Sequence, residues 1–411
     1  MLIHDIFYLE IICIFYMKLL FFIDSLGSGG AQRQLVTLAV GLKKRGHEIR
    51  FLVYHQEDHF FSFLQDAGIP CQVIPTCSYV QRVLAIRRIL RLGWQDVVLT
   101  FLVTPSFCAE LACIPRKRWT LVVGERSANP KMNKGIGLWM RYFHLLADVV
   151  VCNSFTNQLM LETLFPLLRK KICTIYNTVD LALFRESSKI SLYIGDNKPT
   201  EFRIVVAASY QELKNMINVA KALIILRDTH FNKSIVIDWF GGMPTNKSHF
   251  HAAKHFIAEN KLETILRLKS ATKDIASEYS RADAVGLFSF FEGLPNVICE
   301  GMACGKPILL SDVCDAGNLV KNGKNGFLCD PDSPVDIAEK IQRMADLSDF
   351  ERQEMGFESR SMAEHLFNKE IILERYEQIL MRAANHELLL PDCSWPKDVP
   401  ESALCTVQRW A

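Results

Sequence analysis

Two glutamates, Glu292 and Glu300, are the residues of this sequence best placed to do chemistry. They lie eight positions apart in the segment SFFEGLPNVICEGMACGKP at 289–307. A carboxylate accepts two hydrogen bonds and suits adjacent hydroxyls, so one glutamate could hold a sugar and the other the ribose of a nucleotide. Two glutamates at this spacing are usually chance surface residues, and the surrounding serine, glycine and proline are what favour a site.

The residues after Glu292 predict a binding site for an anion. Gly293 permits a tight turn with close backbone approach, and a helix is expected to begin near Pro295 and Asn296. The free N–H groups and positive dipole end of that helix would face an anion such as a diphosphate. Glu300, just over one turn into the helix, would still lie near the same place.

The elements that must carry these residues alternate between strands and helices. A short apolar run at 18–23, a glycine-rich turn at 27–30, a helix at 31–45 and a strand at 49–54 form a βαβ unit, which implies a parallel sheet. The same half is expected to hold strands at 97–102, 120–123, 149–152 and 172–175, and helices at 80–92 and 137–146.

A polar, weakly patterned linker at 186–202 separates this half from a second one. There the expected strands lie at 204–207, 235–240, 285–288 and 307–310, and the expected helices at 215–227, 274–282, 296–303, 336–346 and 369–384. Because ligands of open α/β sheets bind beyond the carboxyl ends of the strands, two such halves predict a substrate cleft between them. The last residues, 386–411, contain three prolines without periodicity and are expected to be loosely ordered.

Composition excludes several classes of protein. The 411 residues are 49% hydrophobic and 22% charged, which is typical of two or three globular domains and excludes a disordered or fibrous chain. The net charge of +2 argues against a nucleic-acid binder. Residues 1–190 carry 22 Lys and Arg against 14 Asp and Glu, whereas the rest carries 25 against 31. The basic first half indicates an anionic partner or is an ordinary fluctuation of charge.

Cysteines and histidines give no sign of a metal centre. The 13 cysteines are scattered, which argues against disulfides or structural zinc and fits a reducing cytosol. Asp330–Asp332 resembles a D-x-D metal motif, but aspartates are common in turns and helix caps, which is the favoured interpretation. The pairs His55/His59 and His251/His255 have a spacing that zinc can use but show no third ligand. We therefore expect no metal site.

The N-terminus has two interpretations. Residues 6–23 form an apolar run interrupted by Glu10 and Lys18, and each charge at the centre of a bilayer would cost about 2.5–3.5 kcal/mol. A complete first strand and its turn begin at Met17. The favoured interpretation is that residues 1–16 are an upstream extension, and the alternative is a weak membrane-contacting segment.

The segment around the two glutamates resembles the E-x7-E region of the retaining glycosyltransferases of family 4, in the GT-B superfamily. Glu292 matches the first glutamate and Glu300 the second, and GMACGKPILLSD at 301–312 continues the pattern. Three further segments are similar to parts of that family: IDSLGSGGAQR at 23–33, IYNTVDLALF at 175–184 and NGKNGFLCD at 322–330. The resemblance covers roughly residues 17–385 and is specific as a set.

The resemblance implies a GT-B fold of the α/β class, with two Rossmann-like domains facing each other across a cleft. The acceptor domain would span 17–190 and the donor domain 191–365, and a helix at 366–385 could pack back on the first domain. It also implies that a sugar passes from a nucleoside diphosphate sugar, with a UDP-sugar favoured, to an acceptor hydroxyl. The anomeric configuration would be retained, and no cofactor or metal would be needed.

The resemblance also implies roles for individual residues. Glu292 would be the catalytic contact to the donor sugar, and Glu300 would bind the ribose. The turn after Glu292 and the glycines of the first loop would approach the sugar and the phosphates. The residues concerned are Gly293, Leu294, Pro295, Asn296, Gly29 and Gly30.

The sequence departs from the family where the donor diphosphate is expected. The family commonly has an Arg and a Lys after the first strand of the second domain. In VVAASYQELKN at 205–215, Lys214 matches the lysine, but Ser209 stands at the arginine position. The loss of one cation should weaken stabilisation of the leaving group unless another substitutes, and Arg126 is one candidate. Glu125 and Arg126 could line the cleft, which is the favoured interpretation, or form a solvated loop pair.

A basic helix indicates where a membrane could be contacted. The helix at 80–92 carries four arginines beside apolar residues, and the runs 116–118 and 169–171 are also basic. These could form a face for anionic lipid, or the helix could simply pack on a core with a solvated outer face. Peripheral contact on the cytoplasmic side would suit a lipid-linked glycan or other sugar acceptor in surface-polysaccharide assembly.

Two other functions stay open. GSGGAQ at 27–32 resembles the GxGxxG of NAD-dependent oxidoreductases, with Gln32 in place of the last glycine and Glu57 or Asp58 after the second strand. This fingerprint is poor and leaves the two-glutamate segment unexplained. Ser209 favours the other possibility, a catalytically silent subunit that binds a nucleotide sugar.

Overall fold

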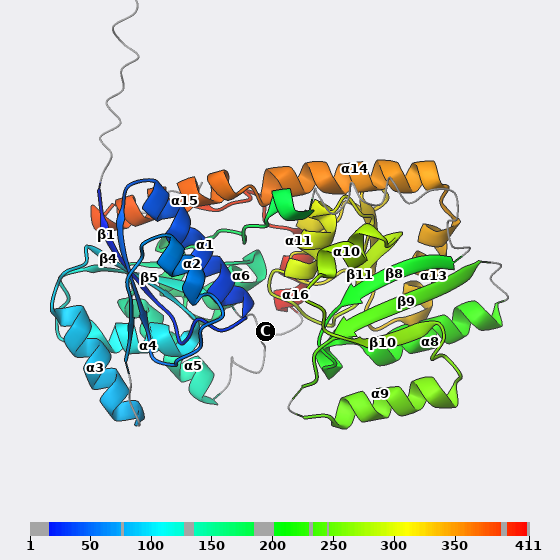
Figure 1. The fold of residues 1–411 in the computed structure, drawn as a ribbon, viewed down its shortest axis with the longest axis horizontal. Helices are drawn as coiled ribbons and strands as arrows, with labels where there is room; N and C mark the ends of the chain where they lie inside the picture. The colour runs from blue at the N-terminus through cyan, green and yellow to red at the C-terminus, as the bar shows by residue number, and fades with distance from the viewer. Residues whose placement is uncertain are drawn as a thin grey trace, which may run out of the picture. The chain divides into compact units, whose positions relative to one another are not determined.

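The computed structural model describes residues 16–74, 78–126, 135–184, 201–229, 233–244, 246–387 and 393–408. These residues form two compact units, whose elements Figure 1 labels. The first comprises Met1–Gly124, Trp139–Val150 and Tyr376–Leu389, and the second comprises Glu125–Leu138, Val151–Arg375 and Leu390–Ala411. The expected extension at 1–16, except for Tyr16, and the expected domain boundary at 190 lie outside the described residues.

The first half of the chain builds a seven-stranded sheet with the order β3-β2-β1-β4-β5-β6-β7. Strands β1, β2 and β4 lie parallel to their neighbours, as the βαβ pattern predicts. The strands are β1 (Lys18–Phe22), β2 (Glu48–Val53), β3 (Cys71–Val73), β4 (Val97–Phe101), β5 (Thr120–Glu125), β6 (Val149–Cys152) and β7 (Ile172–Thr174). The helices are α1 (Gly30–Lys44), α2 (Phe61–Asp66), α3 (Tyr79–Arg91), α4 (Val103–Ala112), α5 (Gly135–Tyr142) and α6 (Phe155–Leu164).

The second half builds a parallel six-stranded sheet with the order β10-β9-β8-β11-β12-β13. Its strands are β8 (Glu201–Ala207), β9 (Ser234–Gly241), β10 (Leu266–Ser270), β11 (Ala284–Leu287), β12 (Ile308–Ser311) and β13 (Gly326–Cys329). Its helices are α8 (Met216–Asp228), α9 (Ser248–Glu259), α10 (Ile275–Ser280), α11 (Asn296–Ala303), α12 (Ala316–Leu319), α13 (Pro334–Asp346) and α14 (Asp349–Leu366). The predicted α/β class, with two Rossmann-like sheets, is confirmed.

Helix α11 is held tightly against the second sheet, and this fixes the residues at its start. A Cβ atom added at Gly301 would stand 2.9 Å from Val285 of β11, so only glycine allows this approach. On its other side α11 packs on α14, where a Cβ at Gly356 would stand 2.2 Å from the carbonyl oxygen of Gly305. The predicted helix at 296–303 is confirmed with the same bounds.

The last described segments follow α14. The sequence boundary between the two units falls within helix α15 (Lys369–Ala384): its residues up to Arg375 belong to the second unit, and those from Tyr376 onward belong to the first. There Glu377 accepts hydrogen bonds from Arg45 (2.7 Å) and is paired with His47 (2.8 Å). The tail at 386–411 was expected to be loosely ordered, but residues Glu401–Gln408 of it form helix α16. The helix is ordered because its Ala403 and Thr406 are buried and give it a packed face. None of the described helices combines the length and apolar character that spanning a bilayer requires.

A buried carboxylate ties three strands of the second sheet together and makes its stability depend on pH. Asp238 of β9 accepts a hydrogen bond from Arg203 of β8 (2.7 Å) and is paired with Lys269 of β10 (2.9 Å). Burial raises the pKa of Asp238, but the hydrogen bonds and charges of Lys269 and Arg203 outweigh it and hold the pKa below its usual value.

Replacing Asp238 by asparagine is therefore expected to destabilise the second unit by about 2–3 kcal/mol at pH 7. A carboxylate with a lowered pKa contributes its stability above the pKa of the unfolded chain, about 4, and loses it as the pH falls further. The difference between Asp238→Asn and wild type in urea denaturation should thus shrink below about pH 4. The exposed pair of Asp346 with Lys233 offers a matched control, since Asp346→Asn should change little at any pH. A pH-independent gap for Asp238→Asn would contradict the assignment.

Candidate functional site

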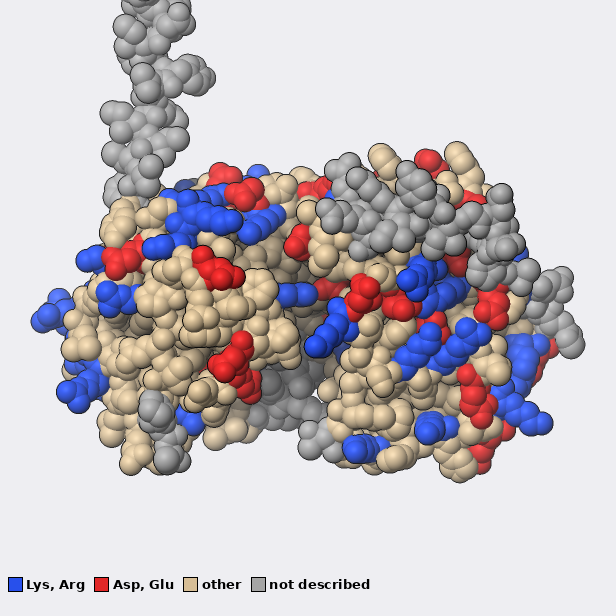
Figure 2. Space-filling view, viewed as in Figure 1, with Lys and Arg blue, Asp and Glu red and all other residues tan. Residues whose placement is uncertain are grey.

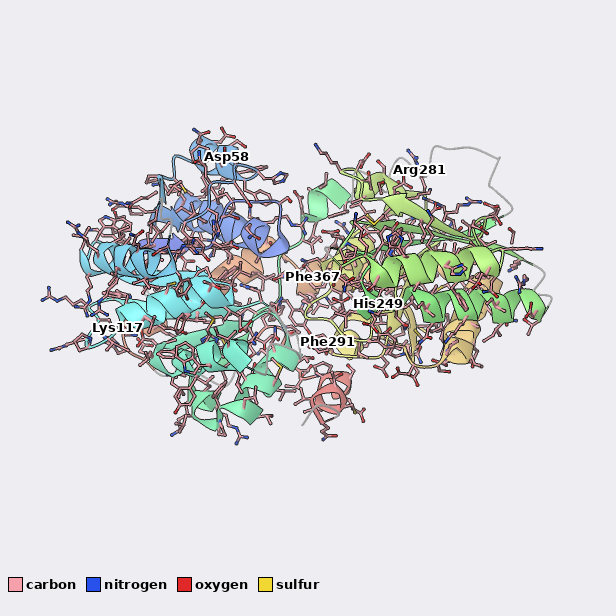
Figure 3. All side chains as sticks on the ribbon, turned by 90° about the horizontal axis from the view of Figure 1, so that it is seen from below. Asp58, Lys117, His249, Arg281, Phe291 and Phe367 are labelled. Atoms are coloured by element: carbon pink, nitrogen blue, oxygen red, sulfur yellow. The ribbon has the colours of Figure 1, made fainter. Side chains whose placement is uncertain are left out.

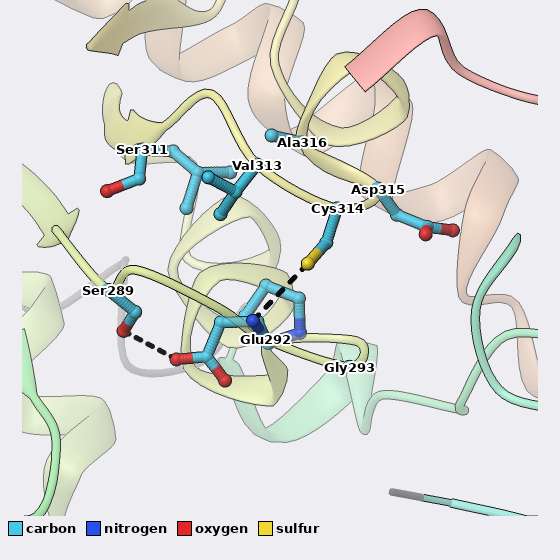
Figure 4. Close-up of a pocket in the computed structure, with 10 residues that line it drawn as sticks. Ser289, Glu292, Gly293, Ser311, Val313, Cys314, Asp315 and Ala316 are labelled. Atoms are coloured by element: carbon cyan, nitrogen blue, oxygen red, sulfur yellow. Dashed lines mark hydrogen bonds between the residues drawn. The ribbon is translucent and has the colours of Figure 1, made fainter. Parts of the chain in front are cut away.

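Three loops meet at the carboxyl ends of β8, β11 and β12, the edge at which parallel sheets bind ligands. A small pocket opens there, lined on one side by Ser289, Glu292, Gly293 and Pro295 and on the other by 311 and 313–316 (Figure 4). Phe291, labelled in Figure 3, packs with Val313 and Cys314 of the pocket lining. All of these residues belong to the second unit.

Glu292 stands at the centre of this site. Its Oε1 accepts a hydrogen bond from Ser289 Oγ (2.6 Å) and one from Lys214 Nζ (2.5 Å). The carboxylate and the ammonium are each about one-sixth exposed, with side-chain exposures of 15% and 18%. The pair is therefore fixed in place while still reachable by a ligand, and Lys214 brings a positive charge to the carboxylate that the sequence singled out.

The position of Lys214 depends on its neighbour, Asn215. Asn215 has a φ of 65°, in the left-handed region that asparagine tolerates better than most residues. Its buried side chain donates to the carbonyl oxygens of Phe288 (3.0 Å) and Pro331 (2.7 Å). Because these bonds join the loops after β8, β11 and β13, Asn215 locks Lys214 beside Glu292.

The start of α11 is open and surrounded by amides. Pro295 is the N-cap residue and no side chain caps the helix, so its first N–H groups are available to an anion. Asn296 Oδ1 accepts a hydrogen bond from Asn177 Nδ2 (2.8 Å), and Asn177 Oδ1 accepts one from Arg126 (3.0 Å). Arg126 is thus linked through the Asn177 side chain to Asn296, the first residue of α11, and all three residues belong to the second unit.

A buried aspartate, Asp315, also lines the pocket. Asp315 is fully buried and accepts hydrogen bonds from Tyr176 Oη (2.7 Å), from Thr156 Oγ1 (2.9 Å) and from the backbone N–H groups of Phe155 (2.8 Å) and Thr156 (3.0 Å). Burial raises the pKa of Asp315, and these hydrogen bonds oppose that shift. Asp315 thus joins the loop after β12 to the first turn of α6.

The remaining predicted residues of the second unit are placed as follows. Glu300 is buried on α11, and Leu294 is buried in the turn before it. Ser209 lies half-buried in the loop between β8 and Lys214, where its carbonyl oxygen accepts the N–H of Gln211 (2.8 Å). Glu125 ends β5 as a buried residue next to Arg126.

The glycine-rich loop belongs to the first unit. Gly29 is the N-cap residue of α1, and Gly30 is its first residue. Two acidic side chains stand at this loop: Glu57 accepts from Ser25 Oγ (2.8 Å), and Asp24 accepts from Gln32 Nε2 (3.0 Å). Glu57, one of the two acidic residues considered for the dinucleotide fingerprint, is thus bonded to Ser25 of this loop.

Candidate metal ligands are engaged in ordinary contacts. Asp330 Oδ1 accepts the N–H of Asp332 (2.9 Å), and the N–H of Asp330 donates to Asp336, as in a turn that leads into a helix. His255 pairs with Glu259 one helical turn away. Within the described residues, no group of three or more His, Cys, Asp or Glu side chains is arranged to hold a metal ion.

Sequence reasoning missed several residues that build the site. Asn215 directly follows Lys214, and Asn177 lies within the segment 175–184 that was matched by resemblance, so polar side chains at such positions are a usable signal. The serine at 289 was noted only as part of the frame around Glu292. Cys314 and Asp315 had no such signal, because their partners lie far away in the sequence.

Comparison with known proteins matches both halves of the chain to families. Residues 28–183 match the family described as Glycosyltransferase Family 4, and residues 194–361 match Glycosyl transferases group 1. A curated relative from Campylobacter jejuni is 22% identical over 356 residues, covering 82% of this chain and 91% of its own. Its name is GalNAc-alpha-(1->4)-GalNAc-alpha-(1->3)-diNAcBac-PP-undecaprenol alpha-1,4-N-acetyl-D-galactosaminyltransferase.

Solved structures show the same fold. Anabaena Alr3699/HepE, crystallised with UDP and glucose, has a TM-score of 0.74 at 20% identity and covers 89% of this chain and all of that one. A glycosyltransferase from Rickettsia africae has a TM-score of 0.72 at 18% identity, covering 90% of this chain and 98% of that one.

Proposed function

The chain belongs to the group 1 glycosyltransferases, and from that premise we propose that it transfers a sugar from a nucleoside diphosphate sugar to an acceptor hydroxyl with retention of the anomeric configuration. The observation that carries this proposal is the contact of Glu292 with Lys214 and Ser289 beside the open start of α11. A carboxylate for sugar hydroxyls and a cation for phosphate stand together there.

In this proposal the leaving diphosphate is stabilised without a metal. When the bond between the anomeric carbon and the phosphate oxygen breaks, negative charge builds up on the diphosphate. Lys214 and the free N–H groups at the start of α11 would neutralise it, because preorganised donors in a water-poor site stabilise developing charge strongly. Glu292 would hold the donor sugar, and Glu300 would bind the ribose.

Arg126 would supply the cation that Ser209 does not. Its guanidinium reaches Asn177, which in turn contacts Asn296 at the first residue of α11. An arginine here would approach the diphosphate from the β5 side, instead of from the loop after β8.

Binding of a nucleoside diphosphate without metal can be tested by thermal shift of the purified chain with UDP, GDP, ADP, CMP and NAD, with and without EDTA. We expect UDP to raise the melting temperature, in keeping with the UDP complex of the Anabaena neighbour. A ligand at 100 times its dissociation constant stabilises by about 2.7 kcal/mol. EDTA should leave the shift unchanged. A shift that requires metal, or one seen with NAD alone, would contradict the proposal.

We further propose that the acceptor is a glycan on a lipid diphosphate, and that the enzyme contacts the cytoplasmic face of a membrane through α3. The name of the Campylobacter relative includes such an acceptor. One face of α3 and the residue after it expose Val80, Leu84 and Leu92 together with Arg88 and Arg91. Figure 2 shows Lys and Arg side chains gathered along the edge of the first unit that carries α3. A mixed apolar and basic face is the kind that binds an anionic interface.

The membrane contact predicts that the chain sediments with vesicles containing anionic phosphatidylglycerol and less with neutral phosphatidylcholine. Arg88→Ala should lower the partition coefficient about fivefold, because a basic residue near the surface contributes about 1 kcal/mol. Leu84→Glu should lower it further. Phe357→Glu, which changes another exposed apolar residue, on α14 in the second unit, is the control and should sediment like wild type. Equal sedimentation of all three variants would refute a role for α3.

A further inference from the structure

The C-terminal segment Cys393–Gln408 is packed into the second unit beside the pocket. Trp395 pairs with the strand that leads to Ile175: its N–H donates to Thr174 O (2.6 Å), and its carbonyl oxygen accepts the N–H of Tyr176 (3.1 Å). Helix α16 then packs on α6 and α12. The segment thus reaches the loop after β12, which forms one wall of the pocket.

Three hydrogen bonds tie this segment to that loop. The N–H of Cys314 donates to Thr406 Oγ1 (2.7 Å), and the N–H of Gly317 donates to Ser402 Oγ (3.0 Å). Asn318 Nδ2 donates to the carbonyl oxygen of Asp398 (2.9 Å). The loop is therefore held along its length by the end of the chain.

Thr406 is a fixed acceptor. Its hydroxyl donates to the carbonyl oxygen of Ser402 one helical turn earlier (2.6 Å), which leaves a lone pair for the N–H of Cys314. Cys314 itself has a φ of 54°, a conformation that costs energy for a residue with a Cβ atom. The hydrogen bond from Cys314 to Thr406 therefore holds a backbone that would otherwise relax.

Cys314 also contacts Glu292, the proposed catalytic carboxylate. Its Sγ accepts the N–H of Glu292 (3.4 Å), a contact that Figure 4 marks with a dashed line. Cys314 is buried and packs with Phe291, the residue before Glu292. A movement of the Cys314 backbone would move the thiol and release the backbone of Glu292.

We propose that Thr406 of α16 is a positioning residue that fixes Glu292 through Cys314. The catalytic meaning of this role rests on the proposed function, whereas the coupling of α16 to Glu292 is a property of the fold. The C-terminal segment then belongs to the donor site, although Thr406 lies 92 residues after Cys314 in the sequence.

The test is Thr406→Val, which keeps the shape of the side chain and removes the acceptor. We expect amide hydrogen exchange across 290–296 to become about tenfold faster and kcat to fall about tenfold, with KM for the donor little changed. Thr406→Ser keeps the hydroxyl and should restore both values. Thr163→Val is the matched control, because the Thr163 hydroxyl also donates one turn back, to Leu159, but from the exposed side of α6.

A second variant acts on the thiol itself. Cys314→Gly removes the acceptor of the Glu292 N–H, and relief of the positive φ offsets part of the packing that is lost with the buried side chain. It should accelerate exchange at Glu292 and lower kcat. Unchanged exchange across 290–296 in both Thr406→Val and Cys314→Gly would overturn the proposal. If wild type transfers no sugar and binds no nucleoside diphosphate, the proposed function fails, and the exchange rates still decide whether α16 positions Glu292.

Discussion

Replacing Glu292 by alanine is expected to lower kcat/KM for sugar transfer by about 10²–10³-fold, while the melting temperature stays close to that of wild type. The carboxylate joins Lys214 and Ser289 at the pocket but holds no core element together. A lost transition-state contact worth about 3–4 kcal/mol gives a rate effect of this size. Release of the nucleoside diphosphate, followed by steady-state kinetics, measures it.

A matched control for Glu292→Ala is Glu339→Ala. Glu339 also pairs with a lysine, Lys340, but on the exposed face of α13. It should leave kcat/KM unchanged. Glu292→Gln keeps an acceptor for Ser289 and Lys214 and loses the charge, so an activity between those of wild type and Glu292→Ala would show how much the charge contributes. A fully active Glu292→Ala enzyme would refute the assignment of the site.

Replacing Asp315 by alanine is expected to cost about 3–5 kcal/mol of stability, a large share of the 5–15 kcal/mol typical of a folded domain. The substitution leaves four buried donors around Tyr176 and Thr156 without their acceptor. It also removes the negative charge at the start of α6, where the helix dipole favours one.

Urea denaturation followed by tryptophan fluorescence measures this loss. Tyr176→Phe removes one of the four donors and should cost only about 1 kcal/mol. Asp330→Ala, in an exposed turn, is the control and should cost little. If Asp315→Ala were as stable as the control, the hydrogen bonds around Asp315 would contribute nothing to the free energy of unfolding.

Much of the fold was predictable because local chemistry and periodicity agree. Helix α11 was predicted to the residue, since Pro295 can begin a helix and small residues follow that fit against a sheet. Helix α14 was missed, although it has 18 residues. Its apolar pattern is misleading, because Phe350 and Phe357 are exposed in the structure. It also has a glycine, Gly356, in its interior, and the reason for this glycine is a close contact with the carbonyl oxygen of Gly305, which the sequence does not reveal.

The site was predictable where its residues are close in sequence. Glu292 and its turn stand in one segment, and Lys214 could be matched by resemblance. The contacts that hold them are between distant segments: Asn215 with Pro331, Asp315 with Tyr176, and Thr406 with Cys314. Such pairs follow from the packing of the sheet, and no spacing in a single segment predicts them.

The first unit is completed late in the chain, by the residues of α15 from Tyr376 onward, and this has a consequence for how the protein is made. Glu377 pairs with Arg45 and His47, and the carbonyl oxygen of Ala383 accepts a hydrogen bond from the Thr120 hydroxyl. A ribosome that adds about 5–20 residues per second needs roughly 10–45 s to travel from Val150 to Tyr376. For that time the nascent first unit lacks its last helix, so the residues of the second unit up to Arg375 can begin to fold before the first unit is complete.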